Sequence, residues 1–241
     1  MPDHPSVPSG ELLYAIGDIH GRAELLIELL HRIEQDAVRE DANRKRLIFL
    51  GDYVDRGPDS RRAIEILLAQ RPASFEASFL KGNHEKLLLD FLADAGCLRA
   101  WRVNGGDATM LSYGVDVARL ERAGAPPELW RAAFCAALPH SHCEFFETLD
   151  LQASEGDYLF VHAGVLPGVP LDAQHEDDLL WIREEFLNYP GAFGKIVVHG
   201  HTPCTRPDKR ANRIGIDTGV VFTGRLTALK LRGGSQSFLH T

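Results

Sequence analysis

The sequence predicts an α/β (α+β) protein in which two mixed β-sheets pack together and helices flank them. Three apolar runs, at 12–16, 46–50 and 75–80, each end in a loop rich in Asp, His or Asn, and a stretch with helical spacing follows each loop. Successive strand–loop–helix units of this kind form a parallel sheet through right-handed crossovers. Residues 143–163 and 195–231 instead contain a hairpin pattern and short apolar runs, which we assign to the second sheet.

Length and composition favour one ordinary globular unit. With 241 residues and neither a linker nor an internal repeat, we expect a single domain over residues 1–241. Apolar residues make up 44% of the chain and charged residues 25%, as in typical soluble proteins. The formal net charge of −8 creates no field that attracts nucleic acid or anionic lipid. Any phosphate site must therefore be built locally.

The N-terminal residues and the cysteines indicate the cellular compartment. Residues 1–10 contain three prolines and no apolar core, so they do not resemble a signal peptide. No run approaches the roughly 18 apolar residues of a membrane span. The four cysteines are widely spaced, without a CxxC pair, which argues against a structural zinc site. We expect reduced thiols, a cytoplasmic location, and neither a membrane nor a nucleic acid as partner.

The first unit carries an Asp-x-His pair. Its strand at 12–16 ends in the loop GDIHG at 17–21, which contains Asp18 and His20. Two residues this far apart on an extended segment point the same way, because side chains alternate along a strand. The pair is a plausible two-ligand unit for a metal, although Asp-x-His alone is common in turns. The helix that follows has apolar residues at helical spacing: Leu25, Leu26, Leu29, Leu30 and Ile33.

The second unit has the most informative loop. Its strand at 46–50 leads into GDYVDRG at 51–57, and Pro58 is suited to open the helix that follows. Two carboxylates, Asp52 and Asp55, and the guanidinium of Arg56 thus lie on a strand-to-helix loop. This combination favours metal and phosphate chemistry over a surface ion pair.

The third unit places further polar residues at the same edge. Its strand at 75–80 ends in KGNHE at 81–85, and an apolar helix face follows at Leu87, Leu88, Phe91 and Leu92. Ligands bind in open α/β sheets at the ends of the strands. Because the three strands are parallel, we expect all three loops to lie together at one edge of the sheet.

Residues 94–140 depart from this pattern and predict a helical accessory segment beside the site. A helix opens at Pro126 and Pro127, has one apolar face, and ends at Pro139. We interpret His140 and His142, just beyond it, as surface residues.

The second half predicts strands with polar ends. Runs at 145–151 and 158–161 flank a turn at 154–157, and His162 ends the second run. A helix over 176–187 would contain Trp181 and Arg183. We expect further strands at 195–198, before the loop HGHTP at 199–203, and at 214–216 and 226–231. The tail after Arg232 is rich in Gly and Ser, and we expect it to fray.

The ordered set GDIHG, GDYVDRG, GNHE, HAG and HGHTP resembles the metal-dependent phosphoprotein phosphatase family of the calcineurin-like metallophosphoesterases. The resemblance is strongest to short bacterial and bacteriophage-lambda-type serine/threonine phosphatases, and it covers residues 12–231. It implies the metallophosphoesterase sandwich of two packed sheets.

The resemblance also implies roles for individual residues. His84 matches the general acid, Asp55 its orienting partner, and Arg56 and Arg183 the phosphate-binding arginines. An exposed arginine on an amphipathic helix is the other interpretation of Arg183. In HGHTP we choose His201, which directly follows the glycine, over His199. The implied metal ligands are Asp18 and His20 for the first ion, Asp52 for both ions, and Asn83, His162 and His201 for the second.

This ligand set suits two divalent ions. Oxygen and imidazole ligands without thiolate favour Mn, with Fe or Zn as further possibilities. Two ions about 3.5–4 Å apart lower the pKa of a water and neutralise phosphoryl oxygens. The leaving group needs a proton, and we expect the Asp55 carboxylate to raise the pKa of His84 so that this histidine supplies it.

Three functions remain open on the sequence. The first is a serine/threonine protein phosphatase, whose substrate is a phosphorylated protein or peptide; a small phosphorylated metabolite or dinucleotide is another possible substrate. The second is a symmetrical dinucleoside tetraphosphatase that cleaves diadenosine tetraphosphate, which IDTG at 216–219 and GRLTA at 224–228 also resemble. The third is a non-catalytic phosphopeptide-binding module, but every expected ligand position is filled.

Overall fold

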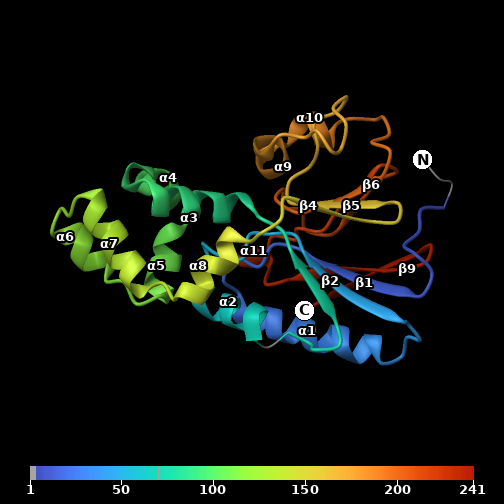
Figure 1. Cartoon of the computed structure of the whole chain (residues 1–241), viewed down its shortest axis with the longest axis horizontal. Coiled ribbons are helices and arrows are strands. Elements are labelled where there is room, and N and C mark those ends of the chain that lie inside the picture. The colour runs from blue at the N-terminus through green and yellow to red at the C-terminus, as the bar shows by residue number, and fades with distance from the viewer. Residues whose placement is uncertain (1–3, 70) are drawn as a thin grey trace.

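Two five-stranded mixed sheets pack against each other, with helices on their outer sides, in the computed structural model (Figure 1). The predicted fold class is therefore confirmed. The structure describes residues 4–69 and 71–241. Residues 1–3, part of the stretch in which we expected no signal peptide, lie outside the described residues. Within the described ranges, no helix has both the length and the apolar character needed to cross a bilayer.

The first sheet holds the three strand–loop–helix units. Its strand order is β10-β9-β1-β2-β3, with β1, β2 and β3 parallel and β9 antiparallel to β1. Helices α1 and α2 make the crossovers and lie along its outer face (Figure 1). The bounds are β1 Glu11–Ile16, α1 Ala23–Ala37, β2 Arg44–Phe49, α2 Ser60–Ala69, β3 Glu76–Phe79, β9 Thr227–Arg232 and β10 Ser235–His240.

The second sheet has the order β4-β5-β6-β8-β7. Strands β5, β6 and β8 are parallel, and the two edge strands are antiparallel to their neighbours. Helices α9 and α10 lie over this sheet, and α11 precedes β9 (Figure 1). The bounds are β4 Gln152–Glu155, β5 Tyr158–Val161, α9 Glu176–Trp181, α10 Glu184–Leu187, β6 Ile196–His199, β7 Asp208–Lys209, β8 Arg213–Gly215 and α11 Val220–Thr223.

Strand β1 is buried on both faces, and its side chains alternate between two cores. Leu13 and Ala15 pack between the sheets with Phe160 and Val198. Tyr14, which lies between these two residues in the strand, points to the opposite face and packs in the core that includes residues of α1 and α2. Burial of both faces of the strand explains why the run at 12–16 is continuously apolar.

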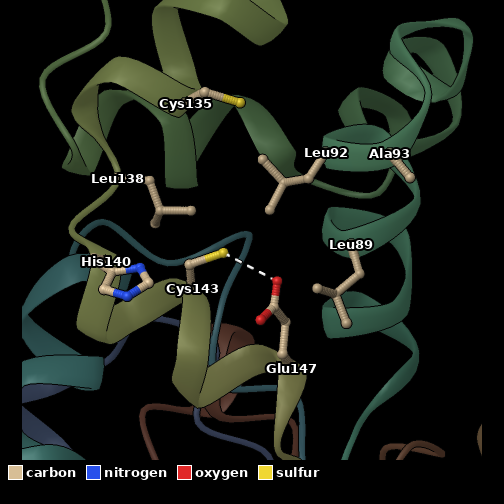
Figure 2. A pocket seen from close by; sticks show the side chains of 8 residues that line it. All are labelled: Leu89, Leu92, Ala93, Cys135, Leu138, His140, Cys143 and Glu147. Atoms are coloured by element: carbon tan, nitrogen blue, oxygen red, sulfur yellow. Dashed lines mark hydrogen bonds between the residues drawn. The ribbon is translucent and has the colours of Figure 1, made fainter.

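A lobe of short helices extends from one end of the first sheet (Figure 1). It includes the predicted accessory segment 94–140. A hollow of about 640 Å³ opens in it, where Leu89, Leu92 and Leu138 face the thiol of Cys143, which donates to Glu147 over 3.4 Å (Figure 2). The lobe comprises α3 Asn83–Ala93, η1 Ala95–Cys97, α4 Leu98–Val103, α5 Gly106–Ser112, α6 Val117–Arg122, α7 Pro127–Ala137 and α8 His140–Glu147.

The strand predicted at 145–151 is wrong: α8 continues to Glu147, a turn follows, and within this range Asp150 alone forms an isolated bridge, with Leu80. The buried residues are His142, Phe145, Phe146 and Leu149, at the i, i+3, i+4, i+7 spacing of a helix. His142 is therefore a buried residue and not a surface one, and its Nδ1 lies 2.8 Å from the Tyr113 hydroxyl.

Two other expectations also fail. The tail after Arg232 does not fray, because β10 pairs with β9 across a Gly233-Gly234 turn, in which Gly233 has φ +52°. Gly-Gly is a favoured hairpin turn. The helix expected over 176–187 is two short helices, and Arg183, at φ −131° and ψ −91°, separates them.

Candidate metal centre and active site

The backbone is strained at the candidate site. Five non-glycine residues of the described chain have positive φ: His20, Asp52, Asp55, Arg56 and His201. All five are candidates from the sequence. Such conformations cost about 1–3 kcal/mol each and cluster at functional sites, where the surrounding structure holds them in place. The loops therefore adopt unfavourable conformations that bring these side chains together.

Asp52 lies at the centre of the cluster. Its Oδ2 is 3.6 Å from Nε2 of His20 and 3.8 Å from Nε2 of His84, and its Oδ1 is 3.4 Å from Nε2 of His162. Two groups of possible metal-binding residues within the described chain share this aspartate, namely His20–Asp52–His84 and Asp52–His162–His201. A carboxylate common to two groups has the arrangement expected of a ligand that bridges two ions.

Asn83 joins the second group through its side-chain amide. Its Oδ1 lies 2.9 Å from Nε2 of His162 and 2.9 Å from Nδ1 of His201. His162 gives its Nδ1 proton to the carbonyl of Leu50, at 2.9 Å, which leaves the Nε2 lone pair facing the cluster. The expected second ligand set, Asn83, His162 and His201, is thus brought together with Asp52.

Asp18 lies beside these groups and not within either of them. Its carboxylate accepts hydrogen bonds from the backbone N–H of His201, at 3.1 and 3.3 Å. A Cβ atom at Gly200 would lie 2.1 Å from Asp18 Oδ1, so only glycine allows this approach. The first group contains His84 at the place where the resemblance implies Asp18.

The donor set fits divalent cations. Burial raises the pKa of the Asp18 carboxyl well above its usual value, and the nearby charges of Asp217 and Asp52 raise it further. Buried carboxylates this close together need a compensating positive charge. Two imidazole nitrogens, Nε2 of His84 and Nε2 of His201, are buried without a hydrogen-bond partner in the described part of the chain. Oxygen and nitrogen donors of this kind suit Mn, Fe or Zn.

His84, a member of the first group, forms a buried pair with Asp55. Nδ1 of His84 lies 2.8 Å from Asp55 Oδ2, so the ring is fixed with Nε2 towards Asp52. Two residues of the helical lobe hold the Asp55 carboxylate: Trp101 donates from Nε1 over 3.0 Å, and Thr109 donates from Oγ1 over 2.6 Å. Two residues of the accessory segment thus hold Asp55, the partner of the expected general acid, in place.

The pKa of His84 differs from the expectation. Burial, with a contribution from the charge of Arg56, lowers it to about 3, whereas we expected Asp55 to raise it. Burial also raises the pKa of Asp55 to about 8. The cost of burying a charge outweighs the attraction between the partners. The expectation that Asp55 raises the pKa of His84 therefore fails, and His84 stays a candidate acid on its geometry alone.

The two expected phosphate-binding arginines contact different residues in or next to the cluster. Arg56 is exposed, and its Nη1 donates to Nε2 of His20 over 3.0 Å. Arg183 is also exposed, and its Nη1 donates to Thr202 Oγ1 over 3.3 Å, next to His201. Because Arg183 lies between α9 and α10, it is not the ordinary arginine of an amphipathic helix.

His199 and His201 occupy different surroundings. His199 is buried outside both metal groups, with its ring edge against Phe186 and its Nε2 3.4 Å from Nη1 of Arg213. Arg213 in turn forms an ion pair of 2.8 Å with Asp208. This geometry favours His201 as the ligand and gives His199 a packing role.

Several residues of the site had no role assigned from the sequence. Glu85 is fully buried, and its carboxylate accepts the backbone N–H groups of Asp52, Tyr53 and Gly82 at 2.8–2.9 Å. It therefore ties the second loop to the third, and its place in GNHE was a signal for it. Asp217, in IDTG, is buried near Asp18. Trp101 and Thr109 gave no signal.

Comparisons with known proteins agree with this geometry. The model of the calcineurin-like phosphoesterase family matches residues 12–224. Serine/threonine-protein phosphatase 1 of Salmonella typhimurium is 31% identical over 226 residues, which cover 91% of this chain and 92% of that protein. Bis(5'-nucleosyl)-tetraphosphatase PrpE [asymmetrical] of Oceanobacillus iheyensis is 27% identical over 236 residues, 89% of this chain and 86% of that protein.

A solved structure shares the fold. A protein proposed to be a diadenosine tetraphosphatase superposes with a TM-score of 0.64 at 21% identity, over 98% of each chain. At this identity the likeness shows the fold alone. Together with the family match over residues 12–224 and the relative at 31% identity, it leads to one conclusion: this chain belongs to the calcineurin-like phosphoesterase family and is a hydrolase of the metallophosphoesterase type.

Proposed function

We propose that this protein removes phosphate from phosphoserine and phosphothreonine in proteins or peptides. The observation that carries the proposal is the His84–Asp55 pair, whose unpartnered Nε2 lies 3.8 Å from the aspartate that two metal groups share. A proton donor beside a two-metal site is what a phosphomonoester needs when its leaving group is a serine or threonine alkoxide. The relative at 31% identity, named a serine/threonine-protein phosphatase, supports this substrate class.

The proposed ligands are Asp18 and His20 for one ion, Asn83, His162 and His201 for the other, and Asp52 for both. The family uses a dinuclear metal site, and we propose Mn as the resident metal, with Fe or Zn as alternatives. Two divalent ions supply a water of lowered pKa and neutralise charge on the phosphoryl oxygens when they are bound. We also propose a cytoplasmic location, which the four free cysteines support.

In this proposal, side chains of the protein bind the phosphate and supply the proton to the leaving group. Arg56 and Arg183 face the phosphate from two sides, and each offers a planar fork of donors that matches phosphate oxygens. His84 gives the proton at Nε2 to the leaving oxygen. Asp55 holds Nδ1, so the ring keeps its orientation while that proton moves. Trp101 and Thr109 fix Asp55 and keep water away from it.

A second candidate is the hydrolysis of a dinucleoside tetraphosphate. Relatives at 26–28% identity carry the name bis(5'-nucleosyl)-tetraphosphatase, asymmetrical, whereas the sequence motifs suggested the symmetrical type. The metal-binding residues do not separate the two substrate classes, because both reactions transfer a phosphoryl group to water. We expect the accessory segment 94–140 and the loops beyond His201 to separate them, because these segments shape the surroundings of the centre.

The test compares three substrates on one preparation. Metal-stripped protein, with Mn²⁺ added back, should release phosphate from a phosphoserine peptide and from an aryl phosphate. It should cleave diadenosine tetraphosphate at least about tenfold less efficiently, as kcat/KM, which corresponds to about 1.4 kcal/mol in the transition state. Cleavage of the dinucleotide alone would assign the protein to the second candidate.

A further inference from the structure

The loop IDTG at 216–219 lies against two loops of the candidate metal centre. On one side it meets the loop of Asp18: a Cβ atom on Gly17 would lie 2.6 Å from the carbonyl oxygen of Ile216 and 3.6 Å from the backbone nitrogen of Asp217. On the other side, the carbonyl of Asp217 accepts the backbone N–H of Cys204, the residue after HGHTP, at 3.0 Å. Asp217 therefore lies between GDIHG and HGHTP, two loops that carry expected metal ligands.

Hydrogen bonds within the loop hold the carboxylate of Asp217 in place. Its Oδ1 accepts the backbone N–H of Gly219 at 2.8 Å. The buried hydroxyl of Thr218 donates to the carbonyl of Arg225 at 2.8 Å and lies 2.8 Å from Oγ1 of Thr227. These contacts fix the next residue of the loop to the start of β9. Asp217 is thus a positioned carboxylate and not a mobile surface group.

Asp217 is 7% exposed and lacks a cationic partner. Among the described residues, no arginine, lysine or histidine forms an ion pair with Asp217 or Asp18, and Oδ2 of Asp217 has no hydrogen bond. After burial, the charge of Asp217 is the largest cause that raises the pKa of Asp18, ahead of Asp52. Burial raises the pKa of Asp217, and the charges of Arg56 and Arg183 offset part of this rise.

A bound cation accounts for this accumulation of buried acids. Asp18, Asp52 and Asp217 come from three loops, and buried carboxylates destabilise one another unless a positive charge lies among them. A nitrogen donor faces the same cluster: Nε2 of the fully buried His84 lies 3.8 Å from Asp52 Oδ2 and has no hydrogen-bond partner in the described chain. Carboxylate oxygens and an imidazole nitrogen together suit a divalent ion.

We propose that Asp217 is a further acid of the metal centre, which binds the ion assigned to Asp18 and His20 either directly or through a water on that ion. The inference rests on the two-metal site proposed above, and it applies to both candidate substrates. Groups that hold a ligand or a bound water from just outside the ligand set typically account for a factor of about 10–100 in metal affinity.

The first test titrates metal-stripped protein with Mn²⁺ by calorimetry. The wild type should bind two ions. In Asp217→Asn, which keeps an oxygen to accept the N–H of Gly219, one of the two ions should bind about 10–100-fold more weakly. Asp217→Glu keeps the charge and should bind that ion more tightly than Asp217→Asn does. Asp59→Asn removes an exposed carboxylate and should bind both ions as the wild type does.

Thermal unfolding separates a role in metal binding from a structural role. Without metal, Asp217→Asn should unfold at the Tm of the wild type or above it, because one of three neighbouring buried carboxylates is gone. Added Mn²⁺ should raise Tm less than it does in the wild type, since a ligand stabilises the folded state in proportion to the logarithm of its affinity. A purely structural Asp217 gives the opposite pattern, a lower Tm without metal and an unchanged gain from Mn²⁺.

The outcomes are distinct. Two ions bound by Asp217→Asn with the affinities of the wild type would overturn this inference and leave the proposed function standing. The pattern of a purely structural residue in the unfolding experiment would overturn it as well. A wild type that binds fewer than two ions would overturn the two-metal site proposed above, and this inference with it.

Discussion

Asp52→Asn should lower kcat/KM for a phosphoserine peptide by about a thousandfold or more, because both metal groups lose their common carboxylate at once. Its two carboxylate oxygens lie within 4 Å of imidazole nitrogens of His20, His84 and His162. An amide keeps the shape and one oxygen but loses the negative charge. The measurement is steady-state turnover together with metal content.

Asp59→Asn is the matched control. Asp59 is exposed and lies on the same loop, and its Oδ1 accepts the backbone N–H of Arg62 over 3.3 Å. We expect its activity and metal content to equal those of the wild type. If Asp52→Asn kept both ions and normal turnover, the assignment of Asp52 as the bridging ligand would be wrong.

His84→Asn should keep both metal ions and lower kcat by about 10²–10⁴-fold for a phosphoserine peptide, because the leaving alkoxide would depart without a proton. The loss should be much smaller for an aryl phosphate whose phenol is acidic, since that leaving group needs no proton. The dependence of kcat on leaving-group pKa, compared between wild type and variant, measures this role directly.

This variant also decides between two roles for the same side chain. The geometry groups His84 with His20 and Asp52 as a possible metal site, whereas the resemblance gives that place to Asp18. Loss of a metal ion in His84→Asn would make His84 a ligand and not the acid. Asp55→Asn should have the same dependence on the leaving group but a smaller effect, because the ring would lose its orientation and keep its proton.

Much of the site was predictable because its residues lie in short loops after buried strands. The spacing within GDIHG, GDYVDRG and GNHE fixes which side chains follow each strand, and the parallel order of β1, β2 and β3 brings the loops to one edge. Local sequence thus carried most of the information about which side chains lie together in the candidate metal centre.

The features that could not be predicted from the sequence depend on contacts between segments that are distant along the chain. The support that Trp101 and Thr109 give to Asp55 joins helices α4 and α5 to a loop about fifty residues earlier, and no local pattern records it. The error at 145–151 arose because two adjacent phenylalanines fit a strand as well as a helix, and only their packing against the lobe decides. The pKa of His84 required knowledge of its burial.

The most direct test of the two-metal account is a titration of metal-stripped protein with Mn²⁺, in which bound ions and phosphate release from an aryl phosphate are measured on the same samples. The account predicts two ions per chain and activity that appears as the second ion binds. Full activity in the stripped protein, or two bound ions with no turnover of any phosphate ester, would contradict it.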